Sequence, residues 1–136
     1  MLDGNLDHYN SGAFKAVYHL LIDWACQNSI DQVDLFGTEA FVAKGIYQWK
    51  RKLGPNVKLP PNHFHSKRLY LYIRNDTPEI RHFLISNPIL EMATPKTMRP
   101  VYFHDHLHPP RVDIPAKAGL LEPERFVDLD AIFAGK

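Results

Sequence analysis

Proline placement is the feature that most constrains how this chain can fold. Of its 11 prolines, seven lie from Pro88 onward, at positions 88, 95, 100, 109, 110, 115 and 123. Proline lacks an amide hydrogen and fixes φ, so it disfavours helix interiors and central strands. We therefore expect residues 91–136 to form a proline-rich extension that packs on the body or on a partner chain. Residues 1–90 are expected to form the body.

Helices and short strands are expected to alternate along the body, which predicts an α+β fold. The spacing of apolar residues separates helices from strands, and glycine, proline and asparagine mark the ends. The expected helices cover residues 13–28, 39–53 and 78–87, and the expected strands cover 32–36 and 68–74. In the extension, a strand is expected over 101–106 and a short helix within 123–133.

One core is expected to join the helix 13–28 to the strand 68–74. Its predicted members are Phe14, Val17, Leu21, Trp24, Val33, Leu35, Ile46, Trp49, Leu69, Leu71 and Ile73. The single cysteine, Cys26, excludes an intramolecular disulfide and a cysteine-based zinc site, and we expect its thiol to be buried. The sequence shows neither a secretory signal nor an apolar run long enough to span a membrane. A cytoplasmic protein without a membrane partner is therefore expected.

Charge is distributed unevenly, although the net charge is only +1. Residues 44–75 contain lysines and arginines but no acid, so this segment favours anionic ligands such as phosphates, coenzyme A or nucleic acid. Alternation of tyrosines with apolar residues after Arg68 adds a surface on which bases could stack. The candidate ligand-binding residues are Lys44, Lys50, Arg51, Lys52, Arg68, Tyr70, Tyr72 and Arg74. The alternative is a solvated basic face.

Three short motifs stand out in the body. They are the pair Trp24-Ala25, the segment Val33-Asp34-Leu35-Phe36-Gly37, and the stretch from Gly45 to Gly54 that reads GIYQWKRKLG. Together they resemble the C-terminal part of the Fem-type and CelD-type branch of the GNAT acyltransferase superfamily. The resemblance covers residues 12–75. Phe36 stands where the family has glycine, and Trp49 and Leu53 stand where it has phenylalanine.

The resemblance implies a GNAT-like half-domain made of a helix-strand-helix-strand unit with a small sheet. It implies coenzyme A as a cofactor and Lys50 as a catalytic residue, because a fixed ammonium can stabilise a developing oxyanion. The coenzyme-binding loop of the superfamily precedes the matched region, and the sequence before residue 12 has no counterpart of it. The expected half-domain would therefore need a second chain to complete an active site.

Histidines recur at every second position in the sequence His104, His106 and His108. On a strand this spacing places three imidazoles on one face, where they could bind zinc, with Asp105 pointing away. The alternative is a polar strand face or a loop, since Pro109 and Pro110 follow at once.

Three functions are consistent with these features. We favour a non-catalytic binding or interaction module with a basic, anion-binding surface. The alternatives are an N-acyltransferase, with an acyl-coenzyme A or aminoacyl-tRNA donor, that a second chain completes, and a metal-dependent enzyme that uses the histidines. A homodimer is expected, because half of a sheet would leave an edge and an apolar face to be covered.

Overall fold

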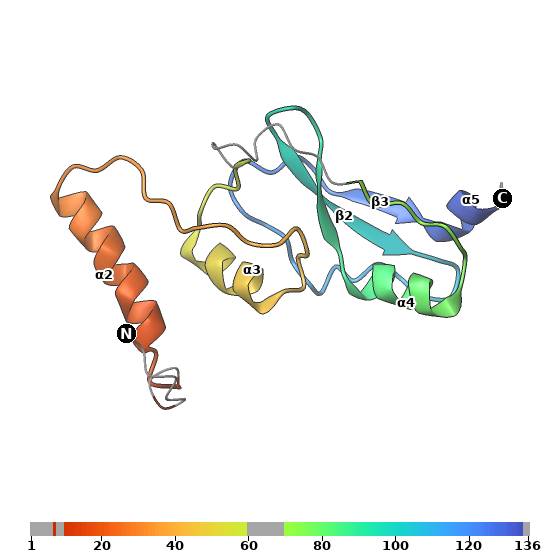
Figure 1. Ribbon diagram of the computed structural model, residues 1–136, viewed down its shortest axis with the longest axis horizontal. Coiled ribbons are helices and arrows are strands. Elements are labelled where there is room, and N and C mark those ends of the chain that lie inside the picture. Colours follow the sequence, from red (N-terminus) through yellow and green to blue (C-terminus); the bar gives the residue numbers. More distant parts are fainter. Residues whose placement is uncertain (1–6, 8–9, 60–69, 135–136) are drawn as a thin grey trace. The chain divides into compact units, whose positions relative to one another are not determined.

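The computed structural model describes residues 7, 10–59 and 70–134 of the 136-residue chain. The chain divides into two compact units, unit 1 (residues 1–36) and unit 2 (residues 37–136), so the division does not fall at residue 90. Unit 1 contains the helix α2 (Ala13–Gln27), and unit 2 contains a sheet with its helices (Figure 1). The fold is mixed α+β, as the sequence predicts.

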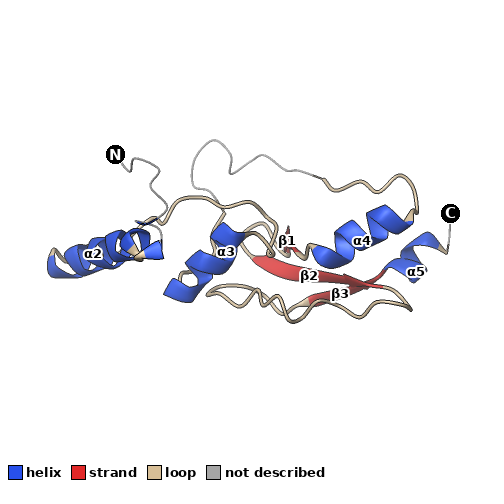
Figure 2. Cartoon of the chain, turned by 90° about the horizontal axis from the view of Figure 1, so that it is seen from below, coloured by secondary structure: helices blue, strands red, loops and turns tan. Residues whose placement is uncertain are grey.

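Unit 2 is built from short elements. Its helices are α3 (Gly45–Lys50), the 3-10 turn η1 (Arg51–Leu53), α4 (Pro78–Ser86) and α5 (Leu129–Phe133), and its strands are β1 (Ile89–Met92), β2 (Met98–His104) and β3 (Arg125–Asp128). The strand β2 lies in the middle of the three-stranded sheet, antiparallel to β1 and parallel to β3. Figure 2 shows α4 lying over this sheet.

The central strand comes from the proline-rich extension, which the number of its prolines makes poorly suited to supply one. The strand expected over 101–106 is found there as β2, shifted to Met98–His104. Pro100 lies within β2, opposite Leu90 of β1. The Leu90 amide points away from β2 and donates to the Ala40 carbonyl oxygen at 2.7 Å. Leu90 and Pro100 therefore lie opposite each other without backbone hydrogen bonds between them. The Pro100 nitrogen then faces β3. Pairing with β3 begins only at Val101, so no amide hydrogen is required there.

Helix ends follow the expected signals where local sequence decides them. The helix α2 ends at Gln27, and α4 begins at Pro78 after Thr77, whose Oγ1 accepts the Ile80 amide at 3.3 Å. The helix expected over 39–53 instead begins at Gly45. The reason is that residues 40–42 run beside β1, where the Val42 amide donates to the Pro88 carbonyl oxygen at 2.8 Å.

The two strands expected in the body are absent from the described residues. Residues 32–36 and 70–74 have no strand pairing there, and residues 68 and 69 lie outside the described part. A strand needs a neighbour for its amides and carbonyls, and alternating side chains alone do not provide one. The strands of the described part, β1, β2 and β3, all follow residue 88 and pair with one another.

The core lies on the two faces of β2 and not where the sequence predicts it. Successive side chains of a strand point to opposite faces. Val101 and Phe103 face α4 and α5, whereas Tyr102 faces α3. The first cluster contains Leu84, Ile85, Val101, Phe103, Val127, Leu129 and Phe133, and the second contains Val42, Tyr47, Leu90, Tyr102 and Ala116.

None of the described residues expected in the core is buried. Val17, Leu21, Trp24, Ile46 and Leu71 are exposed, and the others, Phe14, Val33, Leu35, Trp49 and Ile73, are half-buried. Leu69 lies outside the described residues. The thiol of Cys26 is also exposed, contrary to expectation. The apolar stripe of α2 is present, but most of its side chains are exposed in the structure.

Two buried tyrosines hold the connection between β2 and β3 against the sheet. The Tyr102 hydroxyl donates to the Ile114 carbonyl oxygen at 2.9 Å and accepts the Ala116 amide at 3.1 Å. The Tyr47 hydroxyl donates to the Ala116 carbonyl oxygen at 2.7 Å, and burial raises the pKa of Tyr47 to about 12. These bonds satisfy backbone groups that a connection without regular structure would otherwise bury unpaired.

Candidate functional site

The described residues among those expected to bind an anion have different surroundings. Lys44 is exposed and lies 3.6 Å from the Glu39 carboxylate. Arg51 is half-buried and its Nε donates to Gln48 Oε1 at 2.6 Å. Lys52, Tyr70, Tyr72 and Arg74 are exposed, and neither tyrosine lies on a strand. Arg68 lies outside the described residues.

Lys50 has a different environment from the rest of the basic segment. Only 7% of the residue is exposed, and its Nζ donates to the Gly37 carbonyl oxygen at 3.0 Å. The ammonium therefore holds the start of unit 2 against α3. This contact explains why a lysine is buried here, since a buried charge needs polar partners.

The three histidines of the alternating run do not share a strand face. His104 ends β2, while His106 and His108 lie in the turn that follows. Asp105, which was expected to point away, is the buried residue of the run, with 3% of its side chain exposed. No group of three or more histidine, cysteine, aspartate or glutamate residues in the described part of the chain could hold a metal ion.

Asp105 organises the turn. Its Oδ1 accepts the Leu107 amide at 3.0 Å, the His108 amide at 2.8 Å and His108 Nδ1 at 2.9 Å. Burial alone would raise the pKa of this carboxyl, but the hydrogen bonds from His108 and Leu107 outweigh it and hold the pKa below its usual value. The aspartate therefore stays ionised while it fixes the His108 ring.

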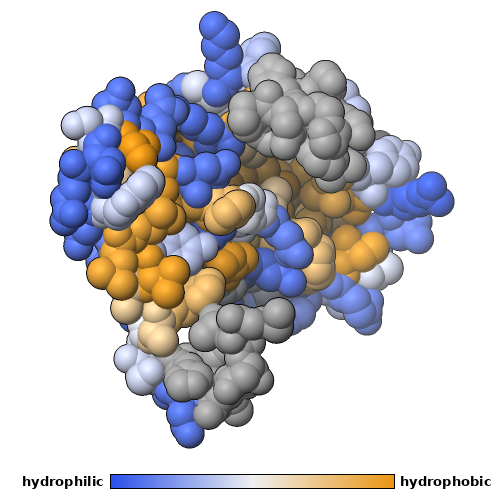
Figure 3. All heavy atoms as spheres, turned by 60° about the vertical axis from the view of Figure 1, so that its left-hand side comes forward, coloured by the Kyte–Doolittle hydropathy of each residue, from blue (hydrophilic) through white to orange (hydrophobic). Residues whose placement is uncertain are grey.

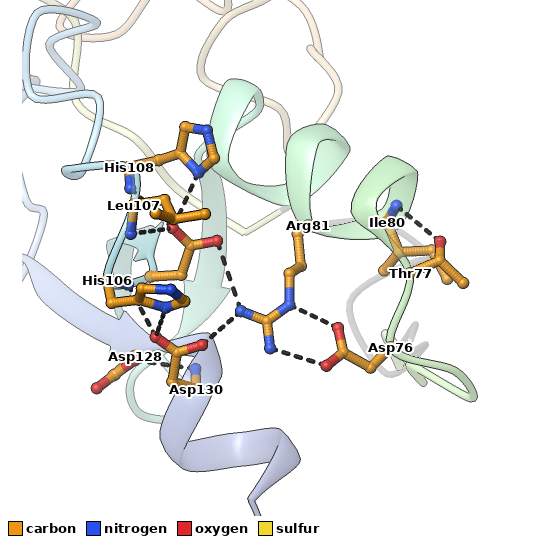
Figure 4. Close-up of polar contacts among 10 residues, drawn as sticks. Asp76, Thr77, Ile80, Arg81, His106, Leu107, His108, Asp128 and Asp130 are labelled. Atoms are coloured by element: carbon orange, nitrogen blue, oxygen red, sulfur yellow. Dashed lines mark hydrogen bonds and ion pairs between the residues drawn. The ribbon is translucent and has the colours of Figure 1, made fainter.

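Arg81 joins this turn to two helices (Figure 4). From α4, its Nε and one terminal nitrogen donate to the two carboxylate oxygens of Asp76 at 2.6 and 2.8 Å. Its other terminal nitrogen donates to Asp130 of α5 at 2.5 Å and lies 3.5 Å from Asp105 Oδ2. The guanidinium also lies 5.3 Å from the centre of the Phe133 ring. We call Asp76, Arg81, Asp105, His106, His108 and Asp130 the Arg81 network.

Asp130 fixes the second histidine. Its Oδ2 accepts the His106 amide and His106 Nδ1, both at 2.8 Å. The pKa of the Asp130 carboxyl is well below its usual range, first because of the hydrogen bond from Arg81 and then because of those from His106. Two imidazoles are thus each oriented by an ionised carboxylate.

The state of both rings follows from their partners. A carboxylate only accepts hydrogen bonds, so Nδ1 carries the hydrogen in His106 and in His108. In the neutral rings Nε2 then holds a lone pair, and no partner for either Nε2 is found among the described residues. Such a nitrogen can accept a hydrogen bond or a proton, which suits ligand binding and general base chemistry.

Both histidines line one pocket of about 420 Å³ between α4 and the turn. Its other walls are Pro78, Arg81, His82, Ile85, Asp105 and Leu107. This volume is in the range of small-molecule sites. A larger hollow of about 530 Å³, lined by residues 37–39 and 44–46, is flatter, and its one lysine is paired with Glu39. The pocket with the histidines is therefore the stronger candidate, and we call it the histidine pocket.

Sequence reasoning identified His106 and His108 but missed the residues that orient them. The two prolines after His108 signalled a turn, and an aspartate three residues before a histidine suits an Asx turn. That signal could have identified Asp105. Nothing in the local sequence links Asp76, Arg81 and Asp130, because tertiary packing brings them together.

Comparisons with protein-family models, with curated proteins and with solved structures give no match for this chain. None of the described helices combines the length and the apolar character needed to cross a bilayer.

Proposed function

We propose that unit 2 is a binding module whose ligand site is the histidine pocket. The observation that carries this proposal is that two imidazoles of one pocket are each oriented through Nδ1 by a carboxylate. Fixing the two rings costs conformational freedom. Here that cost is met before a ligand binds, because the Nδ1 hydrogen bonds already hold the rings and their Nε2 atoms in place. The rest of the pocket wall combines apolar side chains with a few polar groups, as ligand sites commonly do.

We expect small polar molecules to perturb His106 and His108 when they bind. The experiment is a nuclear magnetic resonance titration of ¹⁵N-labelled protein with n-butylammonium, n-butanol and butyrate, monitored by the side-chain resonances of these histidines. Before ligand is added, both rings should show hydrogen on Nδ1. His19 on α2 is exposed and provides the control resonance. If none of the three probes at millimolar concentration moves either histidine, the proposed site is wrong.

The acyltransferase that the resemblance implies is the alternative function. It requires the Lys50 ammonium to reach a substrate, whereas this group donates to the Gly37 carbonyl oxygen and the residue is buried. A substrate would have to displace Gly37. Calorimetry with coenzyme A and its acyl forms separates the two functions, since a heat that disappears in Lys50→Met favours the acyltransferase.

Self-association is a further proposal, and it is now based on α2 and not on an incomplete sheet. Val17, Leu20, Leu21 and Trp24 follow helical spacing, and Leu20 is 66% exposed. Figure 3 shows hydrophobic residues open on the surface of the molecule. Amphipathic helices of this kind pair readily with a second copy, and a twofold dimer is the commonest closed arrangement.

We expect light scattering at tens of micromolar to give twice the monomer mass. Leu20→Glu should shift the mass to that of the monomer, because a charge on the apolar stripe opposes its burial. Lys15→Glu, on the opposite side of α2, is the matched control and should leave the mass unchanged. A monomer mass for the unaltered protein would contradict the proposal and would leave unit 2 or another protein as the partner of α2.

A further inference from the structure

Charge in the Arg81 network is not balanced. Three carboxylates, those of Asp76, Asp105 and Asp130, surround a single guanidinium. With neutral imidazoles, the network therefore carries two surplus negative charges. Arg81 is the only lysine or arginine lining the pocket in the part of the chain that the structure describes. Electrostatics at this site thus favour a cation, in contrast to the anion expected from the basic segment.

Hydrogen-bonding capacity indicates the same class of ligand. The Nε2 atoms of neutral His106 and His108 accept but do not donate, and the carboxylates also only accept. Arg81 also lines the pocket, but its nitrogens already donate to Asp76 and Asp130, so a carboxylate or phosphate ligand would meet mainly lone pairs. An ammonium group offers three donors and a positive charge, so it matches both features of the site.

The remaining walls limit the shape of the ligand. Pro78, Ile85 and Leu107 give the histidine pocket an apolar side, and its volume is about 420 Å³. An alkyl chain of a few carbons can lie against these side chains and leave water. A metal ion would need several converging ligands, and the described residues offer no such group of three. The geometry therefore favours an organic cation.

We infer that the histidine pocket binds a primary ammonium carried on a short alkyl chain, with Nε2 of His106 and His108 accepting its hydrogens. This inference rests on the proposed ligand site and specifies the class of its ligand.

The test compares three probes with the same alkyl chain, n-butylammonium, n-butanol and butyrate, by nuclear magnetic resonance and calorimetry at pH 8. We expect n-butylammonium to bind at least tenfold more tightly than butyrate, as followed by the His106 and His108 resonances. Added salt should weaken the binding of n-butylammonium, because the attraction is electrostatic.

Variants assign the binding to the two rings. His106→Leu and His108→Leu should each weaken n-butylammonium at least tenfold, and both residues are exposed enough for the fold to persist. His19→Leu on α2 is the matched control and should bind as the unaltered protein does. Tighter binding of butyrate, or equal binding of all three probes, would overturn the inference while leaving the ligand site in place. No response to any probe would instead overturn the proposed function and the inference together.

Discussion

Replacing Phe103 by alanine is expected to lower the free energy of unfolding of unit 2 by about 3–5 kcal/mol, the usual cost of deleting a large buried ring. Phe103 is only 5% exposed and lies in the cluster that joins β2 to α4, β3 and α5. Those elements come from separate parts of the chain and meet at this ring, so we expect the cavity that its removal leaves to stay largely unfilled. Small domains are stable by roughly 5–15 kcal/mol, so the loss would be a large share of the total.

Urea denaturation followed by circular dichroism measures this change. Phe36→Ala is the matched control, because the same ring is 75% exposed in unit 1 and its removal should change stability by no more than about 0.5 kcal/mol. Equal losses in both variants would show that the core is not where the structure places it. A Phe103→Leu variant should recover part of the loss, since it restores apolar volume.

Local sequence determined the parts of the fold that need only neighbouring residues. The helices α2 and α4 begin and end close to the predicted positions, since apolar spacing, Thr77 and Pro78 act within a few residues. Residues 32–36 have the alternation of a strand but belong to no strand in the described part of the chain. Alternation of apolar and polar residues indicates which side chains share a face, but it does not identify the strand that would hydrogen-bond to the backbone.

Pro100 shows how a correct local rule can point to the wrong segment for a central strand. Proline is indeed excluded wherever a ladder hydrogen bond is required. The register of β1 and β2, together with the start of β3 pairing at Val101, leaves position 100 without that requirement. Register depends on residues far apart in the sequence, so the count of prolines could not reveal it. The core lies around β2, and not around the residues whose apolar spacing predicted it.

The candidate site was predictable only in part, for the same reason. His106 and His108 were visible as a pattern, but the pattern was interpreted on a strand that ends at His104. Their function depends on Asp105 in the turn and on Asp130, which lies 24 residues from His106. The basic segment predicted an anion, whereas three aspartates surround Arg81 at the pocket. Composition thus indicated the opposite sign of ligand from the one that we infer.

Replacing Arg81 by methionine is expected to destabilise unit 2 strongly at pH 7 and much less at pH 3. Methionine keeps an unbranched apolar stem but removes the guanidinium that contacts three carboxylates. Asp105, with 3% of its side chain exposed, would then keep its charge with fewer partners. Removing one partner from a buried ionic group is costly because the other charge is left behind.

The pH dependence follows from the direction of the pKa shifts. The pKa values of Asp105 and Asp130 are lower in the folded chain than in an unfolded one, so the unfolded chain binds more protons in acid. Their contribution to stability is complete above the unfolded aspartate pKa of about 3.9 and is lost as the pH falls through the lower folded values. Arg81 is the largest cause of the shift at Asp130, so the variant lacks much of this contribution at pH 7. At pH 3 the unaltered protein has begun to lose it as well, and the two proteins converge.

Arg111→Met is the matched control for this prediction. Arg111 also donates two hydrogen bonds to one carboxylate, both at 2.7 Å to Asp113, but the pair is exposed and isolated. Exposed ion pairs contribute little because water competes with them. Urea denaturation at pH 7 and pH 3 should therefore show a much smaller loss for Arg111→Met at both values. If Arg81→Met lost no more than Arg111→Met, or lost equally at both pH values, the Arg81 network would not be what holds the turn, α4 and α5 together. His106 and His108 would then lack the fixed orientation on which ligand binding is argued.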